Sequence, residues 1–182
     1  MFRRYLSLRT PHQECTSILD MSTKGLSGAF LLIDVDNTIC LRKTDEVDEA
    51  IISFLLQLRR DGRVKEICLL SNVVSRSQRR VDRVARIARK LQCNYVCAFW
   101  PWIKPRPEPY REALTKIGAW PEVTVMIGDQ LLTDILGANK LGMRTVLVRP
   151  LGKDHFITRP RRIWERQVTR LRRIFNVTSP SS

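Results

Sequence analysis

Two aspartates, Asp34 and Asp36, stand at the end of the apolar run in the segment LLIDVDNTIC. Side chains two residues apart on a strand point to the same side, so the two carboxylates would lie close together and repel each other. The repulsion is relieved when a cation binds between them, or when the two groups have different protonation roles. The pair therefore predicts an acidic site that residues elsewhere in the chain complete.

The elements that would carry such a site alternate along the chain. Five short runs rich in β-branched and aromatic residues predict buried strands. These runs cover residues 30–35, 64–70, 95–100, 123–127 and 145–148. Between them, apolar residues recur at helical spacing and predict helices around Ile51, Val84, Ala113 and Ile135. The alternation of strand and helix predicts an α/β fold with a parallel sheet flanked by helices.

Polar residues follow four of the predicted strands. They are Asp34 and Asp36 after the first, Ser71 and Asn72 at the end of the second, Lys104 after the third, and Asp129 with Asp134 after the fourth. The carboxyl ends of parallel strands meet at one edge of the sheet, where open α/β sheets form their binding sites. We therefore expect these side chains to converge on one site.

Each of these residue types suits the transfer of a phosphoryl group. Asp34 and Asp129 offer the carboxylate oxygens that Mg²⁺ prefers, and Asp134 would help to place the ion. The cation would neutralise a substrate phosphate and leave a carboxylate free to attack phosphorus. Asp36 would protonate the leaving oxygen and later deprotonate water, while Lys104 would stabilise the developing negative charge.

Ser71 and Asn72 are predicted to bind phosphate oxygens, and Gly128 to leave room at the turn after the fourth strand. Plainer interpretations stay open for several residues. Ser71 and Asn72 also suit a simple turn. Lys104 also suits an exposed surface, and Asp134 suits a helix start beside the helix dipole.

The ordered motifs DVDNT, LLSN, KP and GDQLLTD cover about residues 29–150, and together they resemble the haloacid dehalogenase (HAD) superfamily of phosphotransferases. The stretches KPRPEPYREAL and GDQLLTDILGANKLGMRTVLVRP look most like subfamily IIIA, which includes bacterial YqeG-type proteins and mitochondrial phosphatidylglycerophosphate phosphatases. The resemblance implies a HAD-like Rossmannoid three-layer sandwich around a five-stranded parallel sheet.

The resemblance also implies an aspartyl-phosphate mechanism, with Asp34 as the nucleophile and Asp36 as the acid and base. It implies that Mg²⁺ is held by Asp34, the Val35 carbonyl and Asp129. The full metal set that we expect is Asp34, Asp36, Asp129 and Asp134. One departure from the family pattern is Val73, where relatives often carry a second Asn after Ser-Asn. This change would affect a substrate contact and leave the catalytic residues intact.

The intervals between the motifs are short. Little more than one helix separates Asp36 from Ser71, and one helix and one strand separate Ser71 from Lys104. Neither interval has room for the cap domain that covers the site in many members of the superfamily, so we predict an open site. The predicted organisation is an N-terminal extension (1–28), a HAD-like core (29–158), a basic amphipathic helix (159–175) and a disordered tail (176–182).

The net charge of +14 predicts attraction to polyanions such as nucleic acid, an anionic membrane surface or a phosphorylated substrate. Basic residues recur at helical spacing in two stripes. They are Arg76, Arg79, Arg83, Arg86 and Lys90, and then Arg159, Arg162, Arg166, Arg170 and Arg173.

Apolar residues accompany the second stripe, namely Trp164, Val168, Leu171 and Phe175. This helix is therefore predicted either to lie on a membrane surface or to pack on the domain as an ordinary surface helix. Trp100 and Trp102 likewise suit either contact with a lipid interface or packing beneath the neighbouring prolines.

The chain has five cysteines, without a CxxC pair, and only two histidines. We predict buried or half-buried reduced thiols, and a histidine-rich metal site is disfavoured. The sequence contains no apolar run of membrane-spanning length, and no signal-peptide core follows the basic N-terminus. We therefore predict a cytoplasmic protein that associates peripherally with the inner face of the membrane.

The leading hypothesis is a Mg²⁺-dependent phosphomonoester hydrolase that dephosphorylates lipid-borne phosphatidylglycerophosphate at an anionic membrane surface. An alternative keeps the chemistry but changes the substrate to a nucleotide, a sugar phosphate or a nucleic-acid end. A third hypothesis, of another class, is a basic nucleic-acid-binding protein with an inactive HAD fold. The lack of a nucleic-acid-binding motif and an aromatic content of 7% disfavour it.

Overall fold

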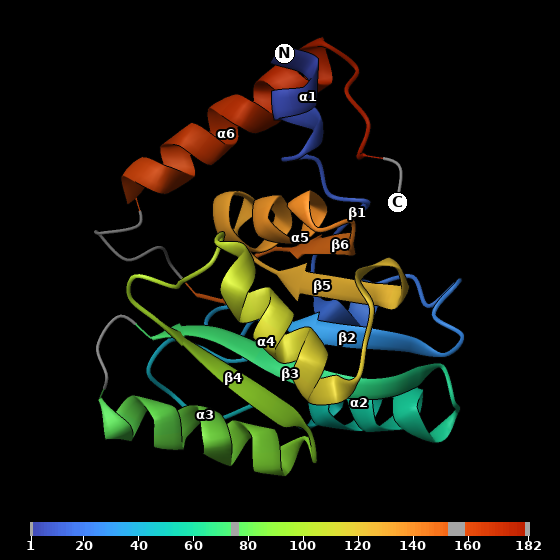
Figure 1. Cartoon of the computed structure of the whole chain (residues 1–182), viewed down its shortest axis with the longest axis vertical. Coiled ribbons are helices and arrows are strands. Elements are labelled where there is room, and N and C mark those ends of the chain that lie inside the picture. The colour runs from blue at the N-terminus through green and yellow to red at the C-terminus, as the bar shows by residue number, and fades with distance from the viewer. Residues whose placement is uncertain (1, 74–76, 153–158, 181–182) are drawn as a thin grey trace.

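Six strands of the chain pair in parallel and form a sheet with the order β1-β6-β5-β2-β3-β4 (Figure 1). The computed structural model describes residues 2–73, 77–152 and 159–180. The strands are β1 (Gln13–Cys15), β2 (Ala29–Ile33), β3 (Val64–Val73), β4 (Asn94–Phe99), β5 (Thr124–Gly128) and β6 (Arg144–Val148). The predicted α/β class with a parallel sheet is confirmed.

The predicted number of five strands is wrong, because the sheet has six. The additional strand, β1, comes from the segment that we predict as an N-terminal extension, and its Gln13 lies opposite Val146 of β6. Its three residues, Gln-Glu-Cys, contain no apolar run and so give no strand signal in the sequence. The strand forms because the backbone groups on the outer side of β6 require hydrogen-bond partners.

Helices and short turns connect the strands. They are α1 (Phe2–Ser7), η1 (Ile18–Asp20), α2 (Glu49–Arg60), α3 (Gln78–Lys90), α4 (Pro107–Ile117), η2 (Pro121–Val123), the π turn η3 (Leu131–Ile135), α5 (Leu136–Lys140) and α6 (Arg159–Ile174). Local sequence explains several ends. Asp48 caps α2 by accepting a hydrogen bond from the Ala50 amide at 2.8 Å. α4 starts at Pro107 and is capped at its C-terminal end by Gly118, whose φ of 62° lies in the left-handed region that favours glycine.

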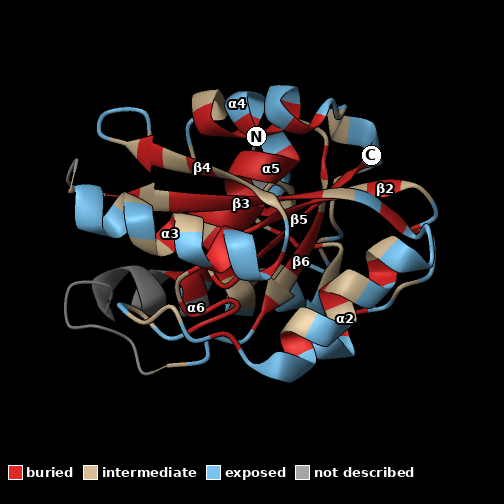
Figure 2. Cartoon of the chain, turned by 90° about the horizontal axis from the view of Figure 1, so that it is seen from below, coloured by how far each residue is buried: buried red, intermediate tan, exposed pale blue. Residues whose placement is uncertain are grey.

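Helices cover both faces of the sheet and give the three layers seen in Figure 1. α2 and α3 pack on one face, where Leu55 and Ile87 share a core cluster with Leu31. α4 and α5 pack on the other face, where Tyr110 shares a second cluster with Leu32. Successive residues of β2 therefore contact opposite helical layers, which explains why this strand is apolar throughout. Figure 2 shows the buried strands and the exposed outer sides of the helices.

The C-terminal helix α6 contacts α1 and the π turn η3 (Figure 1). Val168 is 2% exposed, and Arg172 forms an ion pair with Glu14 of β1 at 2.8 Å. This side of α6 therefore packs on the domain. The Trp164 side chain and the side chains of Arg159, Arg162 and Arg166 lie outside the described residues. Within the described ranges, no helix combines the length and the apolar character that a membrane span requires.

Candidate active site

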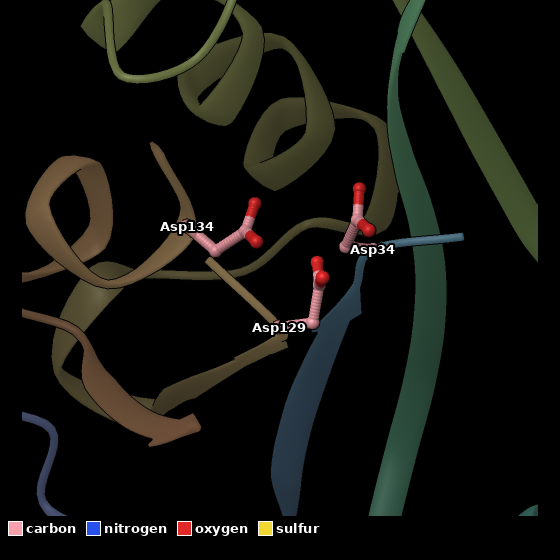
Figure 3. A group of neighbouring side chains, drawn as sticks. All are labelled: Asp34, Asp129 and Asp134. Carbon is pink, nitrogen blue, oxygen red and sulfur yellow. The ribbon is translucent and has the colours of Figure 1, made fainter. Parts of the chain in front are cut away.

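Three carboxylates gather at the carboxyl edge of the sheet, where Asp34 and Asp129 extend side by side and Asp134 points toward them (Figure 3). Asp34 follows β2, Asp129 follows β5, and Asp134 lies on the π turn just beyond. Because β2 and β5 are neighbours, with Ile33 opposite Ile127, the residues that follow them also lie close together. Each aspartate offers an oxygen that lies within 4.8 Å of those of the other two, and all three residues are buried.

Lys104 reaches the same point from the loop between β4 and α4. Its Nζ lies 2.5 Å from Asp34 Oδ1, 2.7 Å from Asp134 Oδ1 and 2.8 Å from the carbonyl oxygen of Leu70. The side chain is 2% exposed, so the interpretation of Lys104 as a surface lysine is wrong. A buried ammonium needs such partners, because an unpaired charge costs several kcal/mol to remove from water.

The buried group carries an excess of negative charge. The group brings together three carboxyl groups and a single lysine, so acidic groups outnumber basic ones. Burial raises the pKa of Asp134 to about 6, although Lys104 acts in the opposite direction. Burial alone would lower the pKa of Lys104, but Asp134 and Asp34 outweigh it and raise this pKa, so the lysine stays protonated. The remaining charge and the oxygen donors fit a hard divalent cation.

Close packing fixes the turn that carries Asp134. A Cβ atom at Gly128 would overlap the Asp134 carboxylate, so this position requires glycine. The Gln130 amide donates to Asp134 Oδ2 at 3.1 Å, and the Tyr110 hydroxyl donates to the Thr133 carbonyl at 2.7 Å. Burial and then the nearby carboxylates raise the pKa of Tyr110 well above its ordinary value, so the hydroxyl remains a donor.

Asp36 stands apart from the three carboxylates. Its Oδ1 accepts hydrogen bonds from both terminal nitrogens of Arg83 on α3, at 2.9 and 2.5 Å. Burial raises the pKa of Asp36, Arg83 lowers it, and Asp34 adds to the rise. The structure thus keeps the Asp36 side chain outside the group that could hold a metal, but at the same edge of the sheet.

Three basic residues of the first stripe bind acidic or carbonyl groups within the chain. Arg83 contacts Asp36, Arg86 Nε lies 2.5 Å from Asp45 Oδ2, and Lys90 Nζ donates to the Asp45 carbonyl at 2.8 Å. Arg76, which we also placed in this stripe, lies outside the described residues. The stripe therefore attaches α3 to the loop after β2 instead of presenting a uniformly free basic face.

Ser71 and Asn72 lie at the end of β3, at the same edge of the sheet. Asn72 Oδ1 accepts from the Lys104 amide at 2.9 Å, and Asn72 Nδ2 donates to the Lys104 carbonyl at 3.3 Å. These two bonds give Asn72 a positioning role, and its Nδ2 keeps a second N–H on the cavity wall for the predicted contact with phosphate. The Val35 carbonyl accepts hydrogen bonds from the amides of residues 38–40, which disfavours it as a metal ligand.

A cavity of about 40 Å³ opens between these residues. Its walls include Asp34, Asp36, Arg42, Ser71 and Lys104. A single water molecule needs about 10–15 Å³ of such a cavity, so the cavity holds only a few groups of that size. A cation or part of a phosphoryl group fits, but most of any larger substrate would have to lie outside.

Several contributors to the site did not stand out in the sequence. Thr38 Oγ1 donates to Asp34 Oδ2 at 3.2 Å, and the quoted motif DVDNT already contained this residue. Arg83 has the spacing of a basic stripe and Tyr110 that of an ordinary apolar helix residue, and neither pattern indicates a contact with the site. Glu165 is a lone acid in an arginine-rich helix, yet it binds the backbone of the π turn at Leu132.

Comparison with known proteins supports a common origin for this arrangement. A HAD-hydrolase-like family model matches residues 102–154. The chain is 30% identical to the probable phosphatase YqeG of Bacillus subtilis over 139 residues, which cover 76% of this chain and 74% of that protein. A shorter match to the phospholysine phosphohistidine inorganic pyrophosphate phosphatase of Xenopus laevis is 50% identical over 46 residues, covering 25% of this chain and 17% of that protein.

The fold is similar to the crystal structure of a putative HAD-like phosphatase from Mesorhizobium loti, with a TM-score of 0.55 and 14% identity. The match covers 66% of this chain and 72% of that chain, and it concerns the fold alone. With the extended similarity to YqeG, these findings show that the chain belongs to the HAD superfamily, as one of its phosphatases.

Proposed function

We propose that the chain is a Mg²⁺-dependent phosphomonoester hydrolase of HAD subfamily IIIA that acts on phosphatidylglycerophosphate at a membrane surface. The buried group of Asp34, Asp134 and Lys104, with Asp129 beside it, is the observation that carries the chemistry. The resemblance of the KPRPEPYREAL and GDQLLTDILGANKLGMRTVLVRP stretches to subfamily IIIA supports the substrate class.

Asp34, Asp129 and Asp134 are the residues that would hold Mg²⁺. The three are buried, offer oxygen donors only and carry more negative charge than Lys104 balances, as a site for a hard cation requires. When bound, the ion would neutralise charge on the phosphate oxygens and so allow an anionic nucleophile to approach.

Asp34 is the proposed nucleophile. One of its carboxylate oxygens bonds to phosphorus while the bond between phosphorus and the ester oxygen breaks, and Asp36 gives its proton to the departing alkoxide. A water oxygen then attacks phosphorus, its proton passes to Asp36, and the bond between Asp34 and phosphorus breaks. Inorganic phosphate leaves, and both carboxyl groups return to their starting states.

The remaining residues position these groups. Thr38 and Lys104 bind the two carboxylate oxygens of Asp34 and hold its orientation. Lys104 also supplies positive charge for the transferred group, and Ser71 offers a hydroxyl on the cavity wall for a phosphate oxygen. Asn72 holds the backbone of Lys104 in place.

The small cavity leaves the carrier of the phosphate outside, as a lipid-borne substrate requires. With about 40 Å³, the cavity accepts part of the reacting phosphoryl group and leaves the alcohol part of the substrate outside. The nucleic-acid hypothesis is less well supported, because Arg83, Arg86 and Lys90 of the first basic stripe are paired within the chain.

The experiment is phosphate release from phosphatidylglycerophosphate in anionic vesicles, with Mg²⁺ and with chelator, using Asp34→Asn as the blank. We expect release that requires both the ion and Asp34. If the protein hydrolyses a soluble aryl phosphate but not the lipid, the chemistry stands and a soluble phosphomonoester replaces the lipid. If turnover persists in Asp34→Asn, the proposed mechanism is wrong.

A further inference from the structure

Four large apolar side chains are exposed at the carboxyl edge of the sheet. Trp100 is 70% exposed, Trp102 52%, Leu41 50% and Leu151 45%. The interpretation in which both tryptophans pack beneath neighbouring prolines is therefore wrong. Single exposed apolar residues are ordinary, but four of them on the loops at one edge give that edge an apolar character.

These residues come from loops that flank the active-site cavity. The Leu151 amide donates to the Asn37 carbonyl at 2.9 Å, and a Cβ at Gly152 would lie 3.0 Å from Leu41 Cδ2, so the loops after β6 and β2 adjoin each other. Trp102 belongs to the loop after β4, two residues before the Lys104 whose ammonium lies in the cavity.

Basic residues accompany the apolar ones. Arg42 lies on the cavity wall, and the guanidinium of Arg106 lies 5.2 Å from the centroid of the Trp102 ring. Arg149 is exposed in the loop after β6. Within the described ranges, these three arginines form no ion pair with an acidic side chain, so their charge is available to an anionic partner.

We propose that these loops form a membrane-binding rim, which comprises Leu41, Arg42, Trp100, Trp102, Arg106, Arg149 and Leu151, and that its partner is an anionic bilayer. The inference rests on the proposed function and specifies how the enzyme approaches a lipid-borne phosphate. Tryptophan favours the bilayer interface, where its ring is buried and its N–H stays hydrated. Arginine is attracted by anionic headgroups, and the net charge of +14 adds to this attraction.

The position of the rim suits the reaction. Because its loops flank the cavity, docking would bring Asp34 to the headgroup layer while the acyl chains remain in the bilayer. A cavity of about 40 Å³ then needs to receive only part of the phosphoryl group. A protein partner would use the same exposed residues without requiring anionic lipid, and the experiment below separates the two.

The test is co-sedimentation of the full chain with vesicles of phosphatidylcholine alone or with added phosphatidylglycerol. We compare Trp100→Ala/Trp102→Ala with Trp120→Ala. Trp120 is a matched control, because it is 74% exposed but precedes β5 and so lies at the opposite edge of the sheet. We expect the double variant to bind anionic vesicles about tenfold more weakly, and Trp120→Ala to bind like the wild type.

A second pair of substitutions, Leu41→Ser/Leu151→Ser, tests the other side of the rim and should also weaken binding. Both double variants should hydrolyse a soluble aryl phosphate at the wild-type rate, which shows that they fold. Unchanged vesicle binding in the tryptophan double variant, equal loss in Trp120→Ala, or equal binding to uncharged vesicles would overturn the proposal.

Different results would contradict the membrane-binding rim and the proposed substrate. If the wild type hydrolyses phosphatidylglycerophosphate dispersed in detergent but does not bind vesicles, the rim is wrong and the function stands. If it binds vesicles through the rim but leaves the lipid phosphate intact, the substrate is wrong and the rim stands.

Discussion

Glu165 of α6 accepts a hydrogen bond from the backbone amide of Leu132, with its Oε1 3.2 Å from the nitrogen. Leu132 belongs to the π turn that carries Asp134, and Glu165 is only 5% exposed. The C-terminal helix is thus connected directly to the backbone of the candidate metal site.

We expect Glu165→Ala to leave the Leu132 amide without its partner and to lower the free energy of unfolding by about 1–3 kcal/mol. The looser turn should also raise the Mg²⁺ concentration needed for half-maximal thermal stabilisation severalfold. Denaturant unfolding and a Mg²⁺ titration of the melting temperature measure these effects. Glu165→Gln keeps an acceptor oxygen and should lose much less. Equal effects of Ala and Gln would show that the hydrogen bond does not position the turn.

Lys104 compensates two buried carboxylates, so its removal should be costly. Lys104→Met should lower the free energy of unfolding by about 3–5 kcal/mol, because Asp34 and Asp134 would be left without their cation. Turnover of an aryl phosphate should fall by about 10²–10³ if the lysine stabilises the transferred group. Urea unfolding in the presence of chelator isolates the effect on stability.

The matched control for this substitution is Lys140→Met, which removes an exposed lysine at the end of α5 and should change either quantity little. The double variant Lys104→Met/Asp134→Asn should regain part of the lost stability, since it removes one of the uncompensated charges. If Lys104→Met alone were as stable as the wild type, the buried ion pairs would not have the role assigned to them.

Removal of one carboxylate should remove most of the thermal stabilisation that Mg²⁺ provides. At 100 times its dissociation constant, Mg²⁺ should stabilise the wild type by about 2.7 kcal/mol, which is roughly 5–11 °C in melting temperature for a chain of this size. Asp129→Asn should lose most of this shift while still melting cooperatively in chelator. A full Mg²⁺ shift in Asp129→Asn would exclude Asp129 from the metal site.

The five cysteines are free, as predicted, and they make stability depend on alkaline pH. Burial raises the pKa of Cys40, Cys68 and Cys93 from 9.0 to about 12 and that of Cys97 to about 11. The unfolded chain therefore loses these protons at lower pH than the folded chain. Their contribution to stability is complete below about pH 9 and is lost as the pH rises toward 12.

We expect the free energy of unfolding, measured with urea from pH 8 to 10.5, to fall over the upper part of this range. Lys104 acts in the same direction, because its pKa is also raised by folding. Cys68→Ala should make the decline less steep. In the native state at pH 8, iodoacetamide should modify Cys68 far more slowly than in denaturant, and equally fast modification would contradict the assigned burial.

The sequence predicted those parts of the fold whose hydrophobic pattern lies within a single strand or helix. β2 and β5 are apolar on both faces, and Asp34 and Asp129 directly follow them, so their proximity required only a parallel sheet. β1 was missed because its polar residues become a strand only through pairing with β6.

Contacts between distant segments could not be predicted in this way. Arg83 and Asp36 are 47 residues apart, and Glu165 and Leu132 are 33 apart. Helical spacing placed Arg83 on a basic face but could not show that the face meets a carboxylate. The sequence also could not predict whether Trp100 and Trp102 are exposed, because a tryptophan next to proline suits both a buried and an exposed loop.

In the proposed mechanism, Asp34 carries the phosphoryl group during turnover. The most direct measurement is mass spectrometry of the enzyme quenched in acid within one turnover, with Mg²⁺ and an aryl phosphate as substrate. We expect one phosphoryl group on the peptide that contains Asp34, absent in chelator and absent from Asp34→Asn. A phosphoryl group on another residue, or turnover by Asp34→Asn at the wild-type rate, would contradict the mechanism.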